Sequence, residues 1–396
     1  MESIKDKVAI IGMGCTRFGE LWDKSFEDLV VEACYEAFEN AGIEPEDIQA
    51  VWMGTAYGPH RGGGIIPPLK LGNTPVTRLE NACATGTDAL RNACYAVAAG
   101  VYDIVLACGA DKLKDYGFSG LPASPPSYPE IALSQTRPAT PMPTQFALLA
   151  MRYFHHYGID PAEGKRALAK ITVKNHHNGT LSPKAHFRRE VSLETVINAP
   201  MIAWPLGLYD CCGVSDGCAA AILTRPEIAR KYRDDYVLVK GLGIAGGDEY
   251  AQIPSDFDWV HWEENLKAAK IAYGEAGITT PREQIDIAIV HDCFTINELV
   301  TYEDLGFSPR GKAIDDINAG FFELDGGLPV NTDGGLKCFG HPLSASGLRM
   351  IYEIYKQLQG KAGPRQVKDA AIGLTHNVGG INGFFNCTVA IFGRVD

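Results

Sequence analysis

The chain has 396 residues, of which 46% are hydrophobic and 21% are charged, a globular balance with room for two or three packed units. Its net charge of −12 argues against a nucleic-acid partner, because no basic face is available to displace counterions from phosphates. The eleven cysteines include no Cys-x-x-Cys pair, so their spacing indicates neither a metal site nor a disulfide framework, and we expect reduced thiols.

The first element along the chain is a strand. Residues 1–14 read MESIKDKVAIIGMG, a charged stub followed by an apolar strand, which differs from a secretory signal. No segment approaches the run of about 18 apolar residues that spans a bilayer. The sequence therefore predicts a soluble, cytoplasmic protein with no membrane partner.

A candidate nucleophile follows the next strands, in the segment VTRLENACATGTDALRNACYAV around Cys83. An extended segment is expected to end near Asn81, and a helix to begin around Thr85. Unpaired amides and the positive end of a helix dipole lower the pKa of a thiol, so we expect an accessible thiolate at Cys83. The alternative for any cysteine is a packed core residue, which is our interpretation of Cys94, Cys108, Cys218 and Cys387.

A long insertion is expected over residues 112–205. It opens with seven prolines between Pro122 and Pro143, continues with the helix TQFALLAMRYFHHYG and ends in the polar run KNHHNGTLSPKAHFRRE. A connection of this length is usually a lid or a binding loop. The chain then returns to the first half at the apolar strand within 208–224.

The remaining elements repeat the first ones in the same order. Residues 236–243 match strand 7–14, the helix and strand of 267–292 match those of 32–54 with the same Ala-Gly-Ile helix end, and 346–377 match 87–111. Alternation of helices with nearly continuous apolar strands predicts an α/β fold with mostly parallel, buried sheets. A duplication explains the three matches, and convergent helix–strand periodicity is the alternative.

Three polar clusters lie in the second half. His291-Asp292-Cys293-Phe294 directly follows a strand, where sites assemble in parallel sheets. His341, in Gly-His-Pro, precedes the helix equivalent to the one after Cys83, so a pseudo-twofold arrangement would bring His341 and Cys83 face to face as base and thiol. The glycines of THNVGGINGF (375–384) could present backbone amides to a substrate oxygen. Alone, each cluster has a structural explanation: a polar strand end, an incidental loop histidine or a plain turn.

In this order, the motifs Cys-x-[Ser/Thr]-Gly, His-Asp-Cys-Phe, Gly-His-Pro and a glycine-rich last turn resemble the thiolases over nearly the whole chain. The His-Asp-Cys-Phe variant resembles the sterol-carrier-protein-type subgroup and its bacterial and archaeal relatives. The resemblance implies a five-layered α-β-α-β-α sandwich of two similar halves, as a homodimer or a dimer of dimers. Residues 1–111 with 206–232 would form the N-terminal half, 112–205 an inserted loop domain covering CoA, and 233–396 the C-terminal half.

The resemblance also implies roles for individual residues. Cys83 matches the acyl-accepting nucleophile, and His341 the histidine that activates it. His291 takes the place of an asparagine that helps to bind the thioester oxygen, and Gly379 with the Cys83 amide would form a second oxyanion hole. Asn377 stands where many thiolases have an acid/base cysteine, so that role falls to Cys293. Ser344 replaces a commoner glycine and could alter the pocket beside His341.

The implied activity is that of a CoA-dependent acyltransferase of the 3-ketoacyl-CoA thiolase or acetyl-CoA C-acetyltransferase type. Its substrates would be acyl-CoA and free CoA, with no permanently bound cofactor, no metal, and a small OB-fold/zinc-ribbon protein as a further partner. Arg188 and Arg189 could meet a CoA phosphate, since a guanidinium suits phosphate, or could be plain solvated side chains. The alternative functions are a retro-aldol lyase acting on a β-hydroxyacyl-CoA and a non-catalytic thiolase-like subunit of a complex.

Overall fold

The structure is a computed structural model that describes residues 3–58, 62–116, 142–248, 257–380, 383 and 386–395. The proline-rich part of the predicted insertion, as far as residue 141, lies outside the described residues. Within the described part, no helix combines the length and the apolar character needed to cross a membrane.

The strands are as follows: β1 (Ala9–Cys15), β2 (Ala50–Gly54), β3 (Val76–Leu79), β4 (Ile104–Asp111), β5 (Met201–Ala203), β6 (Leu206–Gly207), β7 (Gly217–Thr224), β8 (Val237–Gly246), β9 (Ile287–Ile289), β10 (Ile372–Val378) and β11 (Asn386–Arg394). The helices are as follows: α1 (Phe26–Ala41), α2 (Ile66–Leu69), α3 (Thr85–Ala98), α4 (Met142–Tyr157), α5 (Pro161–Thr180), α6 (Leu193–Ile197), α7 (Pro226–Ala229), α8 (Glu263–Ala276), α9 (Pro281–Gln284), α10 (Thr295–Asp304), α11 (Ala313–Asn318), α12 (Gly335–Phe339) and α13 (Leu343–Leu358).

The same strand arrangement occurs twice. Among the described residues, nine strands form one sheet in the order β3-β2-β4-β7-β1-β8-β11-β10-β9. In the first half β2 and β4 are parallel while β4, β7 and β1 alternate in direction, and β9, β10, β11 and β8 repeat this pattern in the second half. The halves join where β1 pairs with β8 at only two positions, Ala9↔Leu238 and Ile10↔Val237. The topology therefore confirms the predicted two similar halves.

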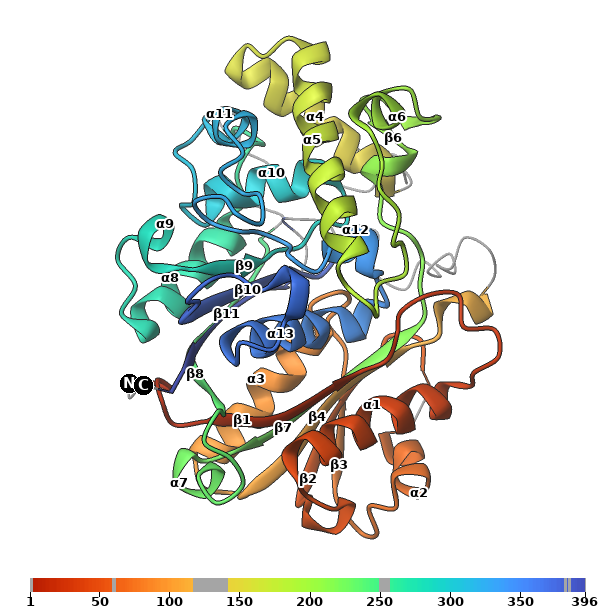
Figure 1. The fold of residues 1–396 in the computed structure, drawn as a ribbon, viewed down its shortest axis with the longest axis vertical. Helices are drawn as coiled ribbons and strands as arrows, with labels where there is room; N and C mark the ends of the chain where they lie inside the picture. The colour runs from red at the N-terminus through yellow and green to blue at the C-terminus, as the bar shows by residue number, and fades with distance from the viewer. Residues whose placement is uncertain are drawn as a thin grey trace.

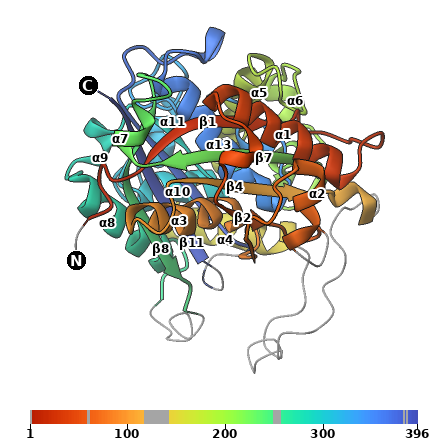
Figure 2. The ribbon, with the colours of Figure 1, turned by 90° about the horizontal axis from the view of Figure 1, so that it is seen from below.

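Helices cover both faces of each half-sheet (Figures 1 and 2). Helix α1 packs on β1 and β7, and α8 packs on β8 and β11. Helices α3 and α13 contact each other and lie between the halves, because α3 contacts β4 and β11 while α13 contacts β7 and β10. The result is the predicted five-layered α-β-α-β-α sandwich.

The repeated Ala-Gly-Ile sequence ends the equivalent outer helices. Gly42 ends α1 with φ 71°, and Gly277 ends α8 with φ 81°. Both values lie in the left-handed region, where a glycine avoids the steric penalty of a side chain. The same local chemistry thus stops the equivalent helix in both halves.

The prediction of mostly parallel sheets is wrong. The sheet is mixed, since β1–β7, β4–β7, β8–β11 and β10–β11 are all antiparallel pairs. Strands β4 and β7 are buried at every position because helices cover both faces. A continuous apolar run therefore reports burial on both faces and carries no information on strand direction.

The polar run at the end of the insertion, to which the sequence analysis assigns no secondary structure, begins inside a helix. Its first seven residues, 174–180, are the last two turns of α5, and Lys174, Asn175 and Asn178 are buried there. The Lys174 Nζ lies 2.6 Å from Glu298 Oε1 on α10. These polar side chains are buried because each meets a polar partner on the C-terminal half.

Candidate active site

Cys83 lies in a tight turn between β3 and α3, as predicted. Ala82 has φ +48°, an uncommon conformation for a residue with a side chain. The turn is closed by the Thr85 hydroxyl, which donates to Ala82 O (2.6 Å) and accepts from the Asn81 amide (2.8 Å). This conformation places the Cys83 side chain directly before the first turn of α3, at 7% exposure.

The expectation of a lowered thiol pKa at Cys83 is wrong for the free protein. Burial raises the pKa of Cys83 to about 12, and the negative charges of Asp111 and Glu80 act in the same direction. The Gly380 amide, which hydrogen-bonds to the sulfur, opposes this shift but does not reverse it. Removal from water outweighs the helix terminus, so Cys83 rests as a neutral thiol.

His341 is the group that contacts this thiol. Its Nε2 lies 3.2 Å from Cys83 Sγ, and its Nδ1 lies 2.7 Å from Ser346 Oγ. The Ser346 hydroxyl donates its single proton to Pro342 O at 2.7 Å. It must therefore accept from the histidine, which puts the imidazole proton on Nδ1 and leaves the Nε2 lone pair facing the thiol. Burial, followed by the positive charge of Arg349, lowers the pKa of His341 to about 3, so the ring is neutral.

His291 faces the same space from the end of β9. The two histidine rings meet edge to face, with centroids 5.3 Å apart. The His291 Nδ1 lies 2.9 Å from Asn377 Nδ2, whereas its Nε2 is buried with no hydrogen-bond partner among the described residues. Burial, followed by the charges of His341 and His376, holds the pKa of His291 well below its usual value.

Cys293 is also close to the nucleophile. It is 6% exposed, and its carbonyl accepts a hydrogen bond from the Cys212 amide at 2.9 Å. Burial raises the pKa of the Cys293 thiol well above its usual value, with further contributions from Cys212 and Cys83. Cys293 therefore holds its proton at neutral pH.

The structure does not support the predicted role of Gly379. Its amide donates to Asn386 O at 2.8 Å and is engaged in the β10–β11 ladder, which extends through the predicted turn residues 375–378. The next amide, Gly380, points to the Cys83 sulfur instead. The amides of Cys83 and Gly380 are therefore the pair that can face an oxyanion beside the nucleophile.

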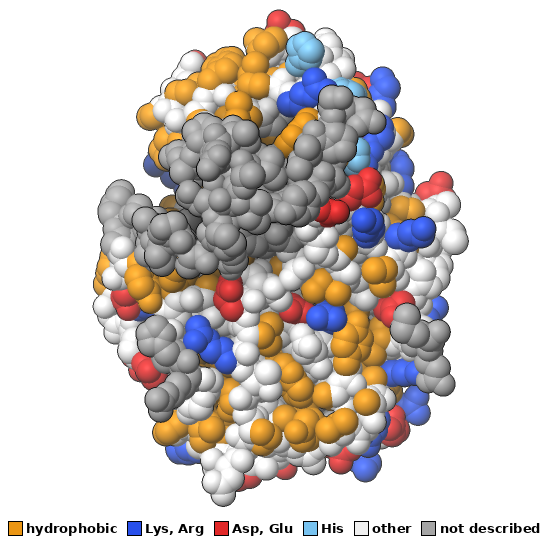
Figure 3. All heavy atoms as spheres, turned by 180° about the vertical axis from the view of Figure 1, so that it is seen from behind, with side chains coloured by type: hydrophobic (Ala, Val, Ile, Leu, Met, Phe, Trp, Pro, Cys, Tyr) orange, Lys and Arg blue, Asp and Glu red, His pale blue; other side chains and the backbone are white. Residues whose placement is uncertain are grey.

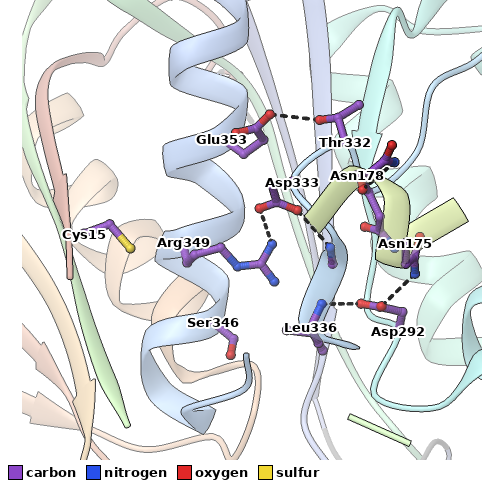
Figure 4. A network of polar contacts seen from close by, with 12 residues as sticks. Cys15, Asn175, Asn178, Asp292, Thr332, Asp333, Leu336, Ser346, Arg349 and Glu353 are labelled. Atoms are coloured by element: carbon purple, nitrogen blue, oxygen red, sulfur yellow. Dashed lines mark hydrogen bonds and ion pairs between the residues drawn. The ribbon is translucent and has the colours of Figure 1, made fainter. Parts of the chain in front are cut away.

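Asp292 and Arg349 make buried polar contacts that join elements near the site (Figure 4). Asp292 accepts hydrogen bonds from the Leu336 amide (2.6 Å) and from Asn175 Nδ2 (2.9 Å), which ties the end of β9 to α12 and to α5. Arg349, fully buried on α13, pairs with Asp333 at 2.5 Å. The Ser344 side chain accepts a hydrogen bond from the Ala56 amide at 2.9 Å.

One group in the described part of the chain has the spacing of a metal site. The sulfur of Cys83 and one ring nitrogen each of His291 and His341 lie within 4.8 Å of one another. Thiolate and imidazole are the ligands that zinc prefers.

Arg188 and Arg189 are exposed on the insertion, where the Arg188 guanidinium lies 3.4 Å from Thr180 O.

Sequence reasoning missed the residues that orient the histidines. Ser346, five positions after His341, is on the first turn of α13 and faces back toward the preceding loop. A hydroxyl one helical turn after a loop histidine is a detectable signal. The contact of Asn377 with His291 has no local signal, because it joins β10 to the segment after β9 across 86 positions.

Comparisons with known proteins agree with this fold. The "Thiolase, N-terminal domain" family matches residues 8–227, and "Thiolase C-terminal domain-like" matches residues 247–394. The chain belongs to the thiolase family.

Similar proteins cover nearly its full length. An acetyl-CoA acetyltransferase of Methanothermobacter thermautotrophicus is 39% identical over 98% of this chain and 99% of its own. Sterol carrier protein 2 of Gallus gallus is 32% identical over 94% of this chain and 70% of its own. The solved Ltp2-ChsH2(DUF35) aldolase superposes with a TM-score of 0.85 at 26% identity, covering 99% of this chain and 98% of that one.

Proposed function

We propose that this protein is a CoA-dependent acyltransferase of the 3-ketoacyl-CoA thiolase or acetyl-CoA C-acetyltransferase type, which works through an acyl group on Cys83. The acetyltransferase that is 39% identical over nearly the full length supports the reaction class. The observation that carries the mechanism is the 3.2 Å contact between Cys83 Sγ and His341 Nε2, with Ser346 holding the imidazole proton on the far nitrogen.

In thiolysis, the Cys83 sulfur attacks the 3-keto carbon while its proton passes to His341 Nε2. Because the thiol pKa is raised and the histidine pKa is lowered, this transfer is coupled to formation of the carbon–sulfur bond. The amides of Cys83 and Gly380 face the resulting oxyanion. The C2–C3 bond then breaks, its electron pair moves onto the thioester as an enolate, and Cys293 protonates C2 to release acetyl-CoA, while the shortened acyl group stays on Cys83.

The second half of the reaction regenerates the enzyme. The Cys293 thiolate takes the proton of free CoA, the CoA sulfur attacks the acyl-Cys83 carbonyl, and His341 returns its proton to Cys83. Claisen condensation is the same sequence in reverse. Coenzyme A is thus a substrate, and no permanently bound cofactor takes part in the scheme.

Intact-mass analysis after incubation with a panel of acyl-CoAs tests the nucleophile. We expect wild type to gain the mass of one acyl group, and Cys83→Ser to lose both the adduct and most of the thiolysis. Cys211→Ser, at a partly exposed thiol whose sulfur faces Gly207 O at 3.6 Å, is the matched control and should still load. A fully active Cys83→Ser enzyme would rule the mechanism out.

The likeness to an aldolase supports one competing function, a retro-aldol lyase acting on a β-hydroxyacyl-CoA. A lyase would release a carbonyl product and acyl-CoA without passing an acyl group to Cys83. The mass experiment therefore separates the two reactions, because only the acyltransferase forms the adduct.

Several further assignments belong to this proposal. The repeated strand order supports the division into residues 1–111 with 206–232, an insertion over 112–205, and residues 233–396. All eleven cysteines are free, which supports a reducing, cytoplasmic location.

Apolar side chains gather on the lower half of the face in Figure 3, in keeping with a homo-oligomer. The two-component name of the aldolase supports a small partner protein.

We also propose that Arg188 or Arg189 meets a CoA phosphate, because both are exposed at the end of the inserted segment. The KM for CoA in Arg188→Ala and Arg189→Ala tests this contact. An unchanged KM in both variants would contradict it.

A further inference from the structure

His291 has one engaged and one free ring nitrogen. Its Nδ1 lies 2.9 Å from Asn377 Nδ2, and its Nε2 is buried without a partner in the described part of the chain. A buried polar atom without a partner is costly, so it indicates either strain or a missing ligand. Which ligand fits depends on whether Nε2 carries a proton.

The surroundings of Asn377 fix the direction of its amide group. Its Oδ1 faces Gly347, where an added Cβ would lie 3.0 Å away, and no described residue donates a hydrogen bond to it. Oxygen tolerates a C–H neighbour, whereas an NH₂ group in that place would leave two buried donors unpaired. The NH₂ group therefore faces His291, and Nδ1 of the histidine must accept.

A neutral imidazole carries one N–H, so a ring that accepts at Nδ1 carries its proton at Nε2. The lowered pKa of His291 is consistent with a neutral ring. We propose that Asn377 is a positioning residue that holds His291 in the Nε2–H tautomer, so that His291 donates a hydrogen bond to the thioester oxygen of the substrate. This inference rests on the proposed function for the identity of the acceptor, and on the contacts alone for the tautomer.

The two histidines of the site are then in opposite tautomers. Ser346 keeps the proton of His341 on Nδ1 and turns a lone pair toward Cys83, whereas Asn377 turns an N–H of His291 into the pocket. One ring can take a proton while the other stabilises negative charge. The same assignment disfavours a metal ion held by Cys83, His291 and His341, because the nitrogen that would bind the metal carries a proton.

The tautomer can be measured without any reaction. Long-range ¹H–¹⁵N correlation spectra of protein labelled with [¹⁵N]histidine distinguish a protonated ring nitrogen from a bare one. The signals of His291 are those lost in His291→Asn. We expect wild-type His291 to carry its proton on Nε2. In Asn377→Asp the new carboxylate can only accept, so we expect a proton to appear on Nδ1.

Kinetics separate positioning from a merely structural effect. Loss of one oxyanion donor lowers kcat by about 10²–10³-fold. We therefore expect Asn377→Leu, which cannot donate, to lower the kcat of thiolysis by up to this range with little change in KM. The alkylation rate of Cys83 by iodoacetamide should remain near wild type. Ser346→Ala should show the opposite pattern, with slower alkylation and the His291 spectrum unchanged.

A wild-type His291 protonated on Nδ1 overturns the inference, even if Cys83 is acylated normally. So does an Asn377→Leu enzyme with wild-type kcat. A wild-type His291 protonated on Nε2 in an enzyme that never loads an acyl group supports the tautomer and rejects the proposed function instead.

Discussion

At the scale of single residues, Cys293 offers the clearest test of how protons move in the site. The raised pKa of Cys293 keeps its thiol protonated. Asn377, which stands where the resemblance to thiolases places an acid/base cysteine, has no group that ionises near neutral pH. We expect Cys293→Ala to accept an acyl group on Cys83 at nearly the wild-type rate but to slow steady-state thiolysis by roughly 10²–10⁴-fold. Single-turnover acylation compared with steady-state thiolysis measures the difference.

The control for this experiment is Cys212→Ala, which keeps the backbone hydrogen bond to Cys293 O. It should retain both rates. If Cys293→Ala matches wild type in both measurements, Cys293 is structural and the proton travels through another group.

Residue types and their order predicted which side chains meet, but not their ionisation. The sequence placed Cys83 before one helix and His341 before its repeat, and the two groups touch. Its expectation of a thiolate considered only the helix terminus. The raised pKa arises from the exclusion of water by both halves, and no local pattern around Cys83 carries that information.

At the scale of elements, the contact of α3 with α13 determines the distance between Cys83 and His341. A Cβ at Gly86 would lie 2.5 Å from Ser344 O and 2.9 Å from the Leu348 amide. We therefore expect Gly86→Ala to push the two helices apart, to destabilise the fold by ~1–3 kcal/mol and to slow acylation of Cys83. Urea unfolding and acyl loading measure the two effects.

Gly274 on α8 provides a matched control, since an added Cβ there has nothing within 4 Å. Gly274→Ala should stabilise the fold by ~0.5–1 kcal/mol and leave acylation unchanged. A Gly86→Ala enzyme with wild-type stability and loading would contradict the role of this helix contact.

The order of elements was predictable because the 3.6-residue and two-residue periodicities and the repeated Ala-Gly-Ile ends are local signals. Strand direction was not predictable, because the antiparallel strand β7 is as continuously apolar as a strand in a parallel sheet. The helical continuation of α5 through residues 174–180 was missed for a related reason. Its polar side chains are satisfied by distant partners such as Glu298, which a local pattern cannot reveal.

At the scale of the whole molecule, the buried neutral histidines link the free energy of unfolding to pH. Burial lowers the pKa of His376 to about 3, whereas an unfolded histidine titrates near 6.5. Below pH ~6.5 this histidine binds a proton in the unfolded chain but not in the native state. The free energy of unfolding therefore falls by ~1.4 kcal/mol for each unit by which the pH is lowered. Buried Asp292 and Asp304, whose pKa values are raised to about 7, act with the opposite sign.

A variant isolates the contribution of a single histidine from these opposing groups. Relative to His376→Gln, wild type should become steadily less stable between pH 6.5 and about 4. Urea unfolding at several pH values gives this difference, with His155→Gln at an exposed position of α4 as the surface control. A difference that does not depend on pH would show that His376 is protonated in the native state.

Because 258 positions separate Cys83 from His341, the ribosome synthesises the two residues at different times. At about 5–20 residues per second, the ribosome finishes His341 roughly 13–52 s after Cys83. Throughout that interval the nascent chain carries the thiol without the imidazole that contacts it. We therefore expect the growing chain to lack catalytic activity toward acyl-CoA. It becomes active only when its last helices dock against the first half.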